Sequence, residues 1–201
     1  MVIWSIVATS FSFEMLRLHN WTVNDLFKSL AEPLLRESEV SRSFSGSFYY
    51  LLGCAITTSL YDKPAAILSI ICMACLDPVA AAVGFYTSSV EWPRLPNGKS
   101  VLGFCASTTA CSVVIYFLCS EWPVGAFFAI KVGIVAALAE LLVPSPQIVM
   151  PARRFPLGFD DNVIIPAVAG FAITELMKRL ELTMAGLPPL RYLDFSWLIH
   201  K

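Results

Sequence analysis

Six apolar stretches, separated by polar connections, run along the chain. Residues 64–84, 101–119 and 123–143 have roughly the 20 residues that a helix needs to cross about 30 Å of hydrocarbon. The stretches at 48–61 and 162–177 are shorter, which indicates that they are tilted or packed inside a bundle. The first is too short to span, so we expect the chain to begin partway through a helix. In order, the stretches cover 1–13, 48–61, 64–84, 101–119, 123–143 and 162–177.

The fold class follows from the membrane environment. Backbone groups in hydrocarbon must be paired within their own segment, so the apolar stretches are expected to be helices. Small residues recur every four positions at Ala129, Gly133 and Ala137, a spacing that lets helices approach closely in lipid. The pattern predicts an all-α fold, a polytopic transmembrane helical bundle of about five to six membrane helices. We assign residues 1–178 to one membrane-embedded domain and 179–201 to an interfacial tail.

The connections alternate in length, and this alternation predicts the topology. Those after the first, third and fifth stretches are long and polar, whereas 62–63 and 120–122 are tight. If every stretch crosses, the long connections share one side, and the positive-inside rule places that side in the cytosol. The eight basic residues there are Arg17, Lys28, Arg36, Arg42, Arg94, Lys99, Arg153 and Arg154. The opposite side has five, which are Lys63, Lys178, Arg179, Arg191 and Lys201.

Composition agrees with a membrane protein and excludes several function classes. Hydrophobic residues make up 57% of the chain and charged residues 14%, against roughly 25% in soluble domains. The formal net charge of -1 provides no basic field for nucleic acid. All six cysteines lie in apolar stretches, where thiols usually behave as small hydrophobes. Cys72 and Cys75 form a C-x-x-C pair, but no second pair completes a zinc site.

Ionisable residues inside apolar stretches are costly and are therefore functional candidates. Asp77 lies roughly two turns before Gly84, Glu140 lies near the end of 123–143, and Lys131 lies deeper. Lys131 and Glu140 are nine residues apart, which at about 100° per residue puts them on opposite faces of a helix. We do not expect them to pair. The predicted topology places further polar residues at the cytosolic starts of two helices, at Lys99, Ser100, Asp160, Asp161 and Asn162.

These positions have the parts of a phosphoryl-transfer site. The run Asp160–Asn162 suits a hard cation such as Mg²⁺, which binds through one or two carboxylates together with substrate phosphates. Helix N-termini beside Lys99 and Arg36 suit the phosphates themselves. A carboxylate such as Asp77 would orient or deprotonate an attacking hydroxyl.

Simpler roles stay open for the same residues. Asp160 is suited to cap a helix, Lys99 to anchor the chain at the membrane surface, and Asp77 to form a structural salt bridge. Residues 153–154 are suited to anionic lipid. The segment PNGKS at 96–100 is not a phosphate-binding P-loop, because Pro93 stands where that motif needs its first glycine.

Five segments in order resemble the CTP-dependent lipid kinases of the endoplasmic reticulum, which include dolichol kinase, phytol kinase and the yeast-type diacylglycerol kinase. Their match covers roughly residues 14 to 175, and the first segment resembles the diacylglycerol kinase branch most. The segments are LLRESEV (34–40) with FYYLLG (48–53), LDPVAAAVG (76–84), NGKSVLGF (97–104), VAALAELL (135–142) and DDNVIIPAVAG (160–170).

The resemblance implies transfer of the CTP γ-phosphate to a lipid hydroxyl with a divalent metal, Mg²⁺ or Ca²⁺. CTP itself, as co-substrate, comes from the resemblance alone. By position, the resemblance implies that Asp77 and Glu140 are catalytic residues. It implies that the nucleotide is bound by Arg36, Gly84, Lys99 and Ser100. It also implies that the metal is bound by Asp160, Asp161 and Asn162.

The chain departs from the family pattern at three places. Phe85 and Tyr86 stand where a basic stretch usually follows the glycine, and Glu37 stands where a second basic residue is common after Arg36. The connection between Glu140 and Asp160 is longer than in the yeast-type enzyme. Fewer cations near a triphosphate put tight nucleotide binding in question.

The leading hypothesis is therefore a CTP-dependent kinase that converts diacylglycerol to phosphatidate, with dolichol and phytol as other acceptors. The expected location is the endoplasmic reticulum or nuclear envelope, with the active site facing the cytosol. The expected partners are the bilayer, its lipid substrate and CTP, without nucleic acid. Two alternatives stay open, a phosphatidate cytidylyltransferase, which would release pyrophosphate, and a non-catalytic membrane protein such as a degenerate kinase homologue. The residues do not identify the lipid acceptor, the metal or the oligomeric state.

Overall fold

The computed structural model describes residues 2–31, 44–88, 93–96, 98–119, 125–142 and 160–180. These residues form helices joined by turns, and within these ranges the only β-type pairing is an isolated bridge between Arg94 and Ser100. The all-α prediction is confirmed. The helices are α1 (Val2–His19), α2 (Trp21–Ala31), α4 (Gly46–Leu60), α5 (Lys63–Tyr86), α6 (Val101–Leu118), α7 (Gly125–Leu142) and α8 (Asp161–Arg179).

Each of the six apolar stretches corresponds to one helix, with ends that differ by a few residues. Residue types at the ends explain where the helices begin. Ser45, Ser100 and Asp160 are N-caps whose side chains accept hydrogen bonds from backbone N–H groups of the first turn. Pro64 lies in the first turn of α5, where its missing N–H costs nothing. Helix α2 was not predicted, because its 11 residues mix polar and apolar positions.

Three helices are long and apolar enough to cross a membrane, namely α5, α6 and α7. Helix α5 has 24 residues, or about 36 Å, and α6 and α7 have 18 residues each, or about 27 Å. Among the described residues, α1, α4 and α8 do not reach the same combination of length and hydropathy. The protein is therefore compatible with an integral membrane protein that has at least these three spans.

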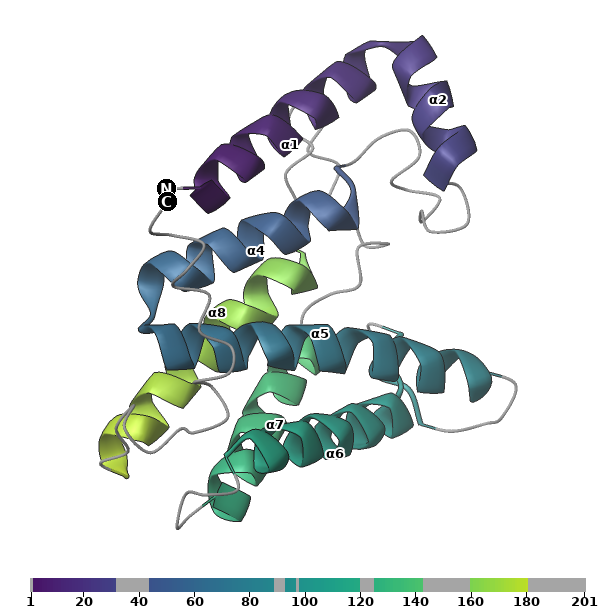
Figure 1. Ribbon diagram of the computed structural model, residues 1–201. Coiled ribbons are helices and arrows are strands. Elements are labelled where there is room, and N and C mark those ends of the chain that lie inside the picture. The colour runs from purple at the N-terminus through teal and green to yellow at the C-terminus, as the bar shows by residue number, and fades with distance from the viewer. Residues whose placement is uncertain are drawn as a thin grey trace.

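Consecutive long helices run in opposite directions. The indole Nε1 of Trp4 donates to Ser59 Oγ over 3.0 Å, and Ser45 Oγ donates to Glu14 Oε1 over 2.7 Å, so α1 lies antiparallel to α4. A turn of two residues then reverses the chain into α5. Figure 1 shows α5, α6, α7 and α8 continuing this alternation. The end of α5, the start of α6, the end of α7 and the start of α8 therefore face the same end of the bundle.

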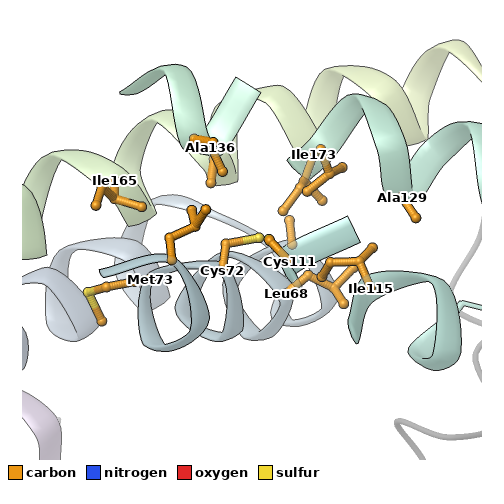
Figure 2. Close-up of a cluster of buried hydrophobic side chains, with 14 of the residues drawn as sticks. Leu68, Cys72, Met73, Cys111, Ile115, Ala129, Ala136, Ile165 and Ile173 are labelled. Carbon is orange, nitrogen blue, oxygen red and sulfur yellow. The ribbon is translucent and has the colours of Figure 1, made fainter. Parts of the chain in front are cut away.

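The core lies where α5, α6, α7 and α8 meet. Figure 2 shows side chains from all four helices in this layer, among them Leu68 and Cys72 of α5 and Cys111 of α6, which are fully buried. In lipid, close packing rather than the hydrophobic effect holds helices together. Gly133 illustrates this, since a Cβ there would overlap Ser112 Oγ and lie 3.0 Å from the Thr108 carbonyl oxygen. The small residue lets α7 approach α6.

Candidate functional site

The connection before α6 is a tight reversal that delivers two predicted residues to the helix start. Leu95 N–H donates to the Lys99 carbonyl oxygen over 2.9 Å, and Gly98 N–H donates to the Leu95 carbonyl oxygen over 2.8 Å. Gly98 has φ of 84°, a conformation that favours glycine. These hydrogen bonds form a turn that places Lys99 and Ser100 immediately before the first residue of α6.

Lys99 lies against the last turn of α7. Its Nζ is 2.7 Å from Glu140 Oε1 and also donates to the Glu140 backbone carbonyl oxygen. Both side chains are nearly covered, with exposed fractions of 11% and 7%. A lysine near a helix C-terminus also complements the partial negative charge of the helix dipole. The structure thus brings together two predicted residues that are 41 positions apart.

Gly84 and Ser100 are neighbours across the α5–α6 junction. A Cβ on Gly84 would lie 3.9 Å from Ser100 Cβ, and one on Gly103 would lie 3.0 Å from the Ala80 carbonyl oxygen. Arg94 closes the junction, because its guanidinium donates to the Gly84 carbonyl oxygen over 2.9 Å and to the Gly98 carbonyl oxygen over 3.2 Å. Sequence reasoning placed Arg94 only as one of several surface cations. Its position at the end of α5 required the tertiary structure.

Asp77 lies on the same face of α5 as Gly84. The two are seven residues apart, which is a rotation of about 700° and a rise of about 10 Å. Since Ala80 of this face packs against Gly103, Asp77 lies deeper along the α5–α6 junction, level with the first turns of α6. Its side chain is half-buried. Pro78 follows Asp77 and removes one backbone donor from α5. Helices commonly bend at a proline of this kind.

The other acidic residues begin α8. Asp160 Oδ1 accepts hydrogen bonds from the backbone N–H of Asn162 over 2.9 Å and from its side-chain amide over 2.8 Å. Asp160 therefore does cap the helix. Asp160 and Asp161 have exposed fractions of only 7% and 5%. The Oδ1 atom of Asp161 is buried and has no hydrogen-bond partner among the described residues.

The electrostatics of this pair disfavour two negative charges. Burial and then the neighbouring carboxylate of Asp161 raise the pKa of Asp160 from 3.8 to about 6, against the smaller opposing effect of the Asn162 N–H. A buried carboxylate oxygen without a donor is costly unless a cation or proton compensates it. The start of α8 therefore has the chemistry of a cation site.

Gly53 fixes the depth at which α8 begins. A Cβ there would overlap the Asn162 carbonyl oxygen, so the middle of α4 lies directly against the first turn of α8. Within α8, the residue that would normally donate to the Asn162 carbonyl oxygen is Pro166, which has no backbone N–H. Farther along, Tyr61 Oη donates to the Ala167 carbonyl oxygen over 2.6 Å. Asp160 and Asp161 are therefore covered where the first turn of α8 packs against α4.

The structure thus forms two groups at one end of the bundle. Lys99, Ser100, Gly84 and Glu140 gather where α5, α6 and α7 meet, and Asp160–Asn162 begin α8. Asp77 lies about 10 Å along α5 from the first group. The remaining predicted residue, Arg36, lies outside the described residues, as do residues 153–154 and the tail 181–201.

A buried ion pair in α1 was missed by sequence reasoning. Arg17 Nη2 lies 2.6 Å from Glu14 Oε2, and both side chains are almost fully covered. Glu14 also accepts from the backbone N–H and Oγ of Ser45, which joins α1 to the start of α4. The signal was present, since opposite charges three residues apart on a helix face each other. Counting Arg17 only as a loop cation concealed it.

No family model, no curated protein and no solved structure matches the chain. The lipid-kinase resemblance consequently stays a hypothesis that depends on the motifs and on the geometry above.

Proposed function

We propose that the chain is a CTP-dependent lipid kinase that transfers the γ-phosphate of CTP to the hydroxyl of diacylglycerol and forms phosphatidate. The acceptor hydroxyl would reach the site from the bilayer, and the nucleotide from the water phase. The proposal places the site at the cytosolic face of the endoplasmic reticulum or nuclear envelope. It also includes α1, α4 and α8 in the membrane domain, giving about six membrane helices.

One observation carries the proposal. Residues that are far apart in the chain and that belong to different motifs lie at a single end of the helical bundle. The contact between Lys99 and Glu140 joins two of these motifs directly, and Gly84 beside Ser100 joins a third. A site for a triphosphate needs cations and a metal-binding carboxylate pair within reach of one ligand. This shared end supports such an arrangement.

The start of α8 fits a divalent metal such as Mg²⁺ or Ca²⁺. Asp161 Oδ1 is buried without a donor, which is the situation that a bound cation would relieve. No cluster of three or more acidic, histidine or cysteine ligands occurs within the described ranges. Mg²⁺ suits such a site, because it often binds through one or two carboxylates and takes its other ligands from water and phosphate. When bound, the metal would supply positive charge against the phosphate oxygens.

The chain's own residues would divide the work as follows. Lys99, oriented by Glu140, and Arg36 would contact the phosphates, and the N-terminus of α6 would face the same anion. In the transfer, a bond forms between the lipid oxygen and the γ-phosphorus, and the bond from that phosphorus to the β–γ bridging oxygen breaks. CDP leaves, and the hydroxyl proton passes to a carboxylate. Asp77 is our candidate for this carboxylate.

The test uses purified protein reconstituted with diacylglycerol and supplied with CTP and Mg²⁺. We expect phosphatidate and CDP as products, and we expect Asp77→Ala to lose phosphatidate formation. The matched control is Asp62→Ala, which removes an exposed carboxylate from the opposite end of α5. Parallel reactions with ATP, dolichol and phytol assign the donor and the acceptor.

Other outcomes exclude the proposal in distinct ways. Release of pyrophosphate when phosphatidate replaces diacylglycerol as the acceptor would assign a phosphatidate cytidylyltransferase. Absence of CTP binding at millimolar concentration would assign a non-catalytic membrane protein. Equal turnover by the Asp77→Ala variant and the unmodified protein would remove Asp77 from the mechanism.

A further inference from the structure

Helix α2 carries an apolar face that the proposed reaction does not use. Its apolar residues Val23, Leu26, Phe27 and Leu30 follow the spacing i, i+3, i+4 and i+7, so they share one side of the helix. Asn24, Asp25 and Lys28 lie on the opposite side together with Trp21, which is 77% exposed, while Thr22 and Ser29 flank Leu26. With 11 residues, or about 16 Å, α2 is too short to cross a membrane.

The orientation of α2 is fixed by contacts to α1. Arg17 Nη1 donates to Asn24 Oδ1 over 3.0 Å, and the guanidinium lies 4.8 Å from the centre of the Phe27 ring. The rings of Phe13 and Phe27 pack edge to face, 5.7 Å apart. Asn20 caps the helix by accepting from the Thr22 N–H over 3.0 Å. Glu14 in turn pairs with Arg17, so the contacts at the elbow connect α2 to the buried ion pair of α1.

Only half of the apolar face is covered by these contacts. Val23 and Phe27 are half-buried, whereas Leu26 is 62% exposed and Leu30 is 76% exposed. The exposed half continues the apolar surface of α1, where Phe13 and Leu16 are exposed. In a protein with three membrane-capable helices, a continuous apolar surface of this kind is compatible with lipid contact.

The position of α2 agrees with the edge of a membrane. Ser45 bonds to Glu14, so the end of α1 lies beside the start of α4, at the same end of the bundle as the candidate site. Figure 1 shows α2 turning away from α1 at the outer margin of the molecule, away from α5 and α8. There it would meet the headgroup layer rather than the hydrocarbon centre.

We infer that α2 is an interfacial helix that binds the bilayer surface on the side of the candidate site. Leu26 and Leu30 enter the boundary between headgroups and acyl chains, and Asp25 and Lys28 face water. The helix also orients α1, through Arg17, relative to the membrane plane. The inference depends on the fold and not on the proposed kinase reaction.

The experiment measures accessibility on both sides of α2 in the full-length protein. Cysteine is introduced singly at Leu26 and Leu30 on one side and at Asp25 and Lys28 on the other, where the side chains are 56% and 35% exposed. The protein is placed in nanodiscs, one copy per disc, and treated with a membrane-impermeant maleimide. Labelling is read by peptide mass spectrometry, so the native cysteines do not interfere. We expect Leu26→Cys and Leu30→Cys to react about tenfold more slowly than Asp25→Cys and Lys28→Cys.

Two results would overturn the inference. Equal rapid labelling at all four positions would mean that water surrounds α2, and equal protection would mean that α2 is covered on all sides. Protection that appears only with two or more copies per disc would assign the surface to a second copy of the chain. The two proposals can fail separately. If the protein had no kinase activity but Leu26 and Leu30 were still protected, the kinase proposal would be rejected and the inference about α2 would stand.

Discussion

The ammonium group of Lys99 and the carboxylate of Glu140 form a nearly buried ion pair, 2.7 Å apart, that joins the start of α6 to the end of α7. A second hydrogen bond from Lys99 to the Glu140 backbone adds to this link. The pair holds the turn before α6 against the bundle, since Lys99 accepts the Leu95 N–H within that turn. Its role is therefore structural as well as electrostatic, whatever ligand the site binds.

Removing one partner of this pair should destabilise the protein strongly. Lys99→Met leaves the Glu140 carboxylate buried without its cation, and Glu140→Gln leaves the ammonium without its anion. We expect each to lower the free energy of unfolding by about 3–5 kcal/mol, because an uncompensated buried charge is costly. The double change Lys99→Met with Glu140→Leu should recover a large part of the loss. Denaturant unfolding in detergent measures these differences.

The exposed pair Lys178–Glu175 provides the control for that experiment. Its side chains have exposed fractions of 69% and 39%, and the charged atoms are 3.3 Å apart. Glu175→Gln should change the free energy of unfolding by less than about 0.5 kcal/mol. If Lys99→Met had an effect equally small, the pair would not hold the turn.

The helices could be predicted from the sequence because lipid leaves a chain few alternatives. The six apolar stretches all correspond to helices, and the spacing of Lys131 and Glu140 correctly separated them. Lys131 is exposed, with its ammonium 4.2 Å from the centre of the Phe127 ring, whereas Glu140 is buried. Both results depend only on local geometry, namely the need for paired backbone groups and the angle of 100° per residue.

The pairing of the charges could not be predicted, since it depends on how helices approach one another. Lys99 was assigned to a nucleotide and Glu140 to catalysis, without any sign that they touch. Gly53 lies in a motif used for the resemblance, yet only the fold shows that it abuts Asn162. Similarly, Asp160 proved to be both a helix cap and one of two buried carboxylates. Sequence patterns identified these residues but not their neighbours.

The Asp160–Asp161 pair should make stability depend on pH. The pKa of Asp160 is raised from 3.8 to about 6, so the folded state binds its proton more tightly than the unfolded state. The free energy of unfolding should therefore decline as pH rises from about 4 to about 6, apart from other groups. Asp160→Asn keeps a residue suited to capping the helix and should remove this decline. Thermal unfolding over pH 4–8 measures it, with Asp62→Asn as an exposed control.

The same pair should make cation binding depend on pH. At pH 7.5, above the raised pKa of Asp160, this carboxylate is available to a cation, so millimolar Mg²⁺ or Ca²⁺ should raise the unfolding temperature; below pH 6 the proton bound to Asp160 should compete with the metal. The double variant Asp160→Asn with Asp161→Asn should lose the response. An equal stabilisation of that variant would show that the metal binds elsewhere.

Two glycines in the resembling motifs should respond differently to substitution by alanine. At Gly53 a Cβ would overlap the Asn162 carbonyl oxygen, which belongs to the backbone and cannot rotate away. We expect Gly53→Ala to cost about 3 kcal/mol and to displace the start of α8. At Gly84 a new Cβ would meet Ser100 Cβ at 3.9 Å, an ordinary van der Waals contact. Gly84→Ala should be neutral or stabilising by up to about 1 kcal/mol.

Activity separates the roles of these two glycines further. If Gly84 lies beside bound nucleotide, Gly84→Ala should raise the KM for CTP while leaving stability unchanged. Gly53→Ala should instead reduce the metal-dependent thermal shift, because it moves Asp160 and Asp161. A strongly destabilised Gly84→Ala protein would contradict the packing at the α5–α6 junction.

The orientation of the bundle can be read from Asn20. Asn20-Trp21-Thr22 is a sequon for N-glycosylation, and all three residues are exposed at the elbow between α1 and α2. Because the end of α1 lies at the same end as the candidate site, the proposed cytosolic orientation predicts that Asn20 stays unmodified in cells. Expression in a glycosylating host, with and without glycosidase treatment, should show no shift in mass. The end of α6 at Leu118 and the start of α7 at Gly125 lie at the opposite end of the bundle, so an engineered sequon inserted between them should be modified and serves as the positive control. A glycan on Asn20 would place the candidate site in the lumen, where CTP does not reach it from the cytosol.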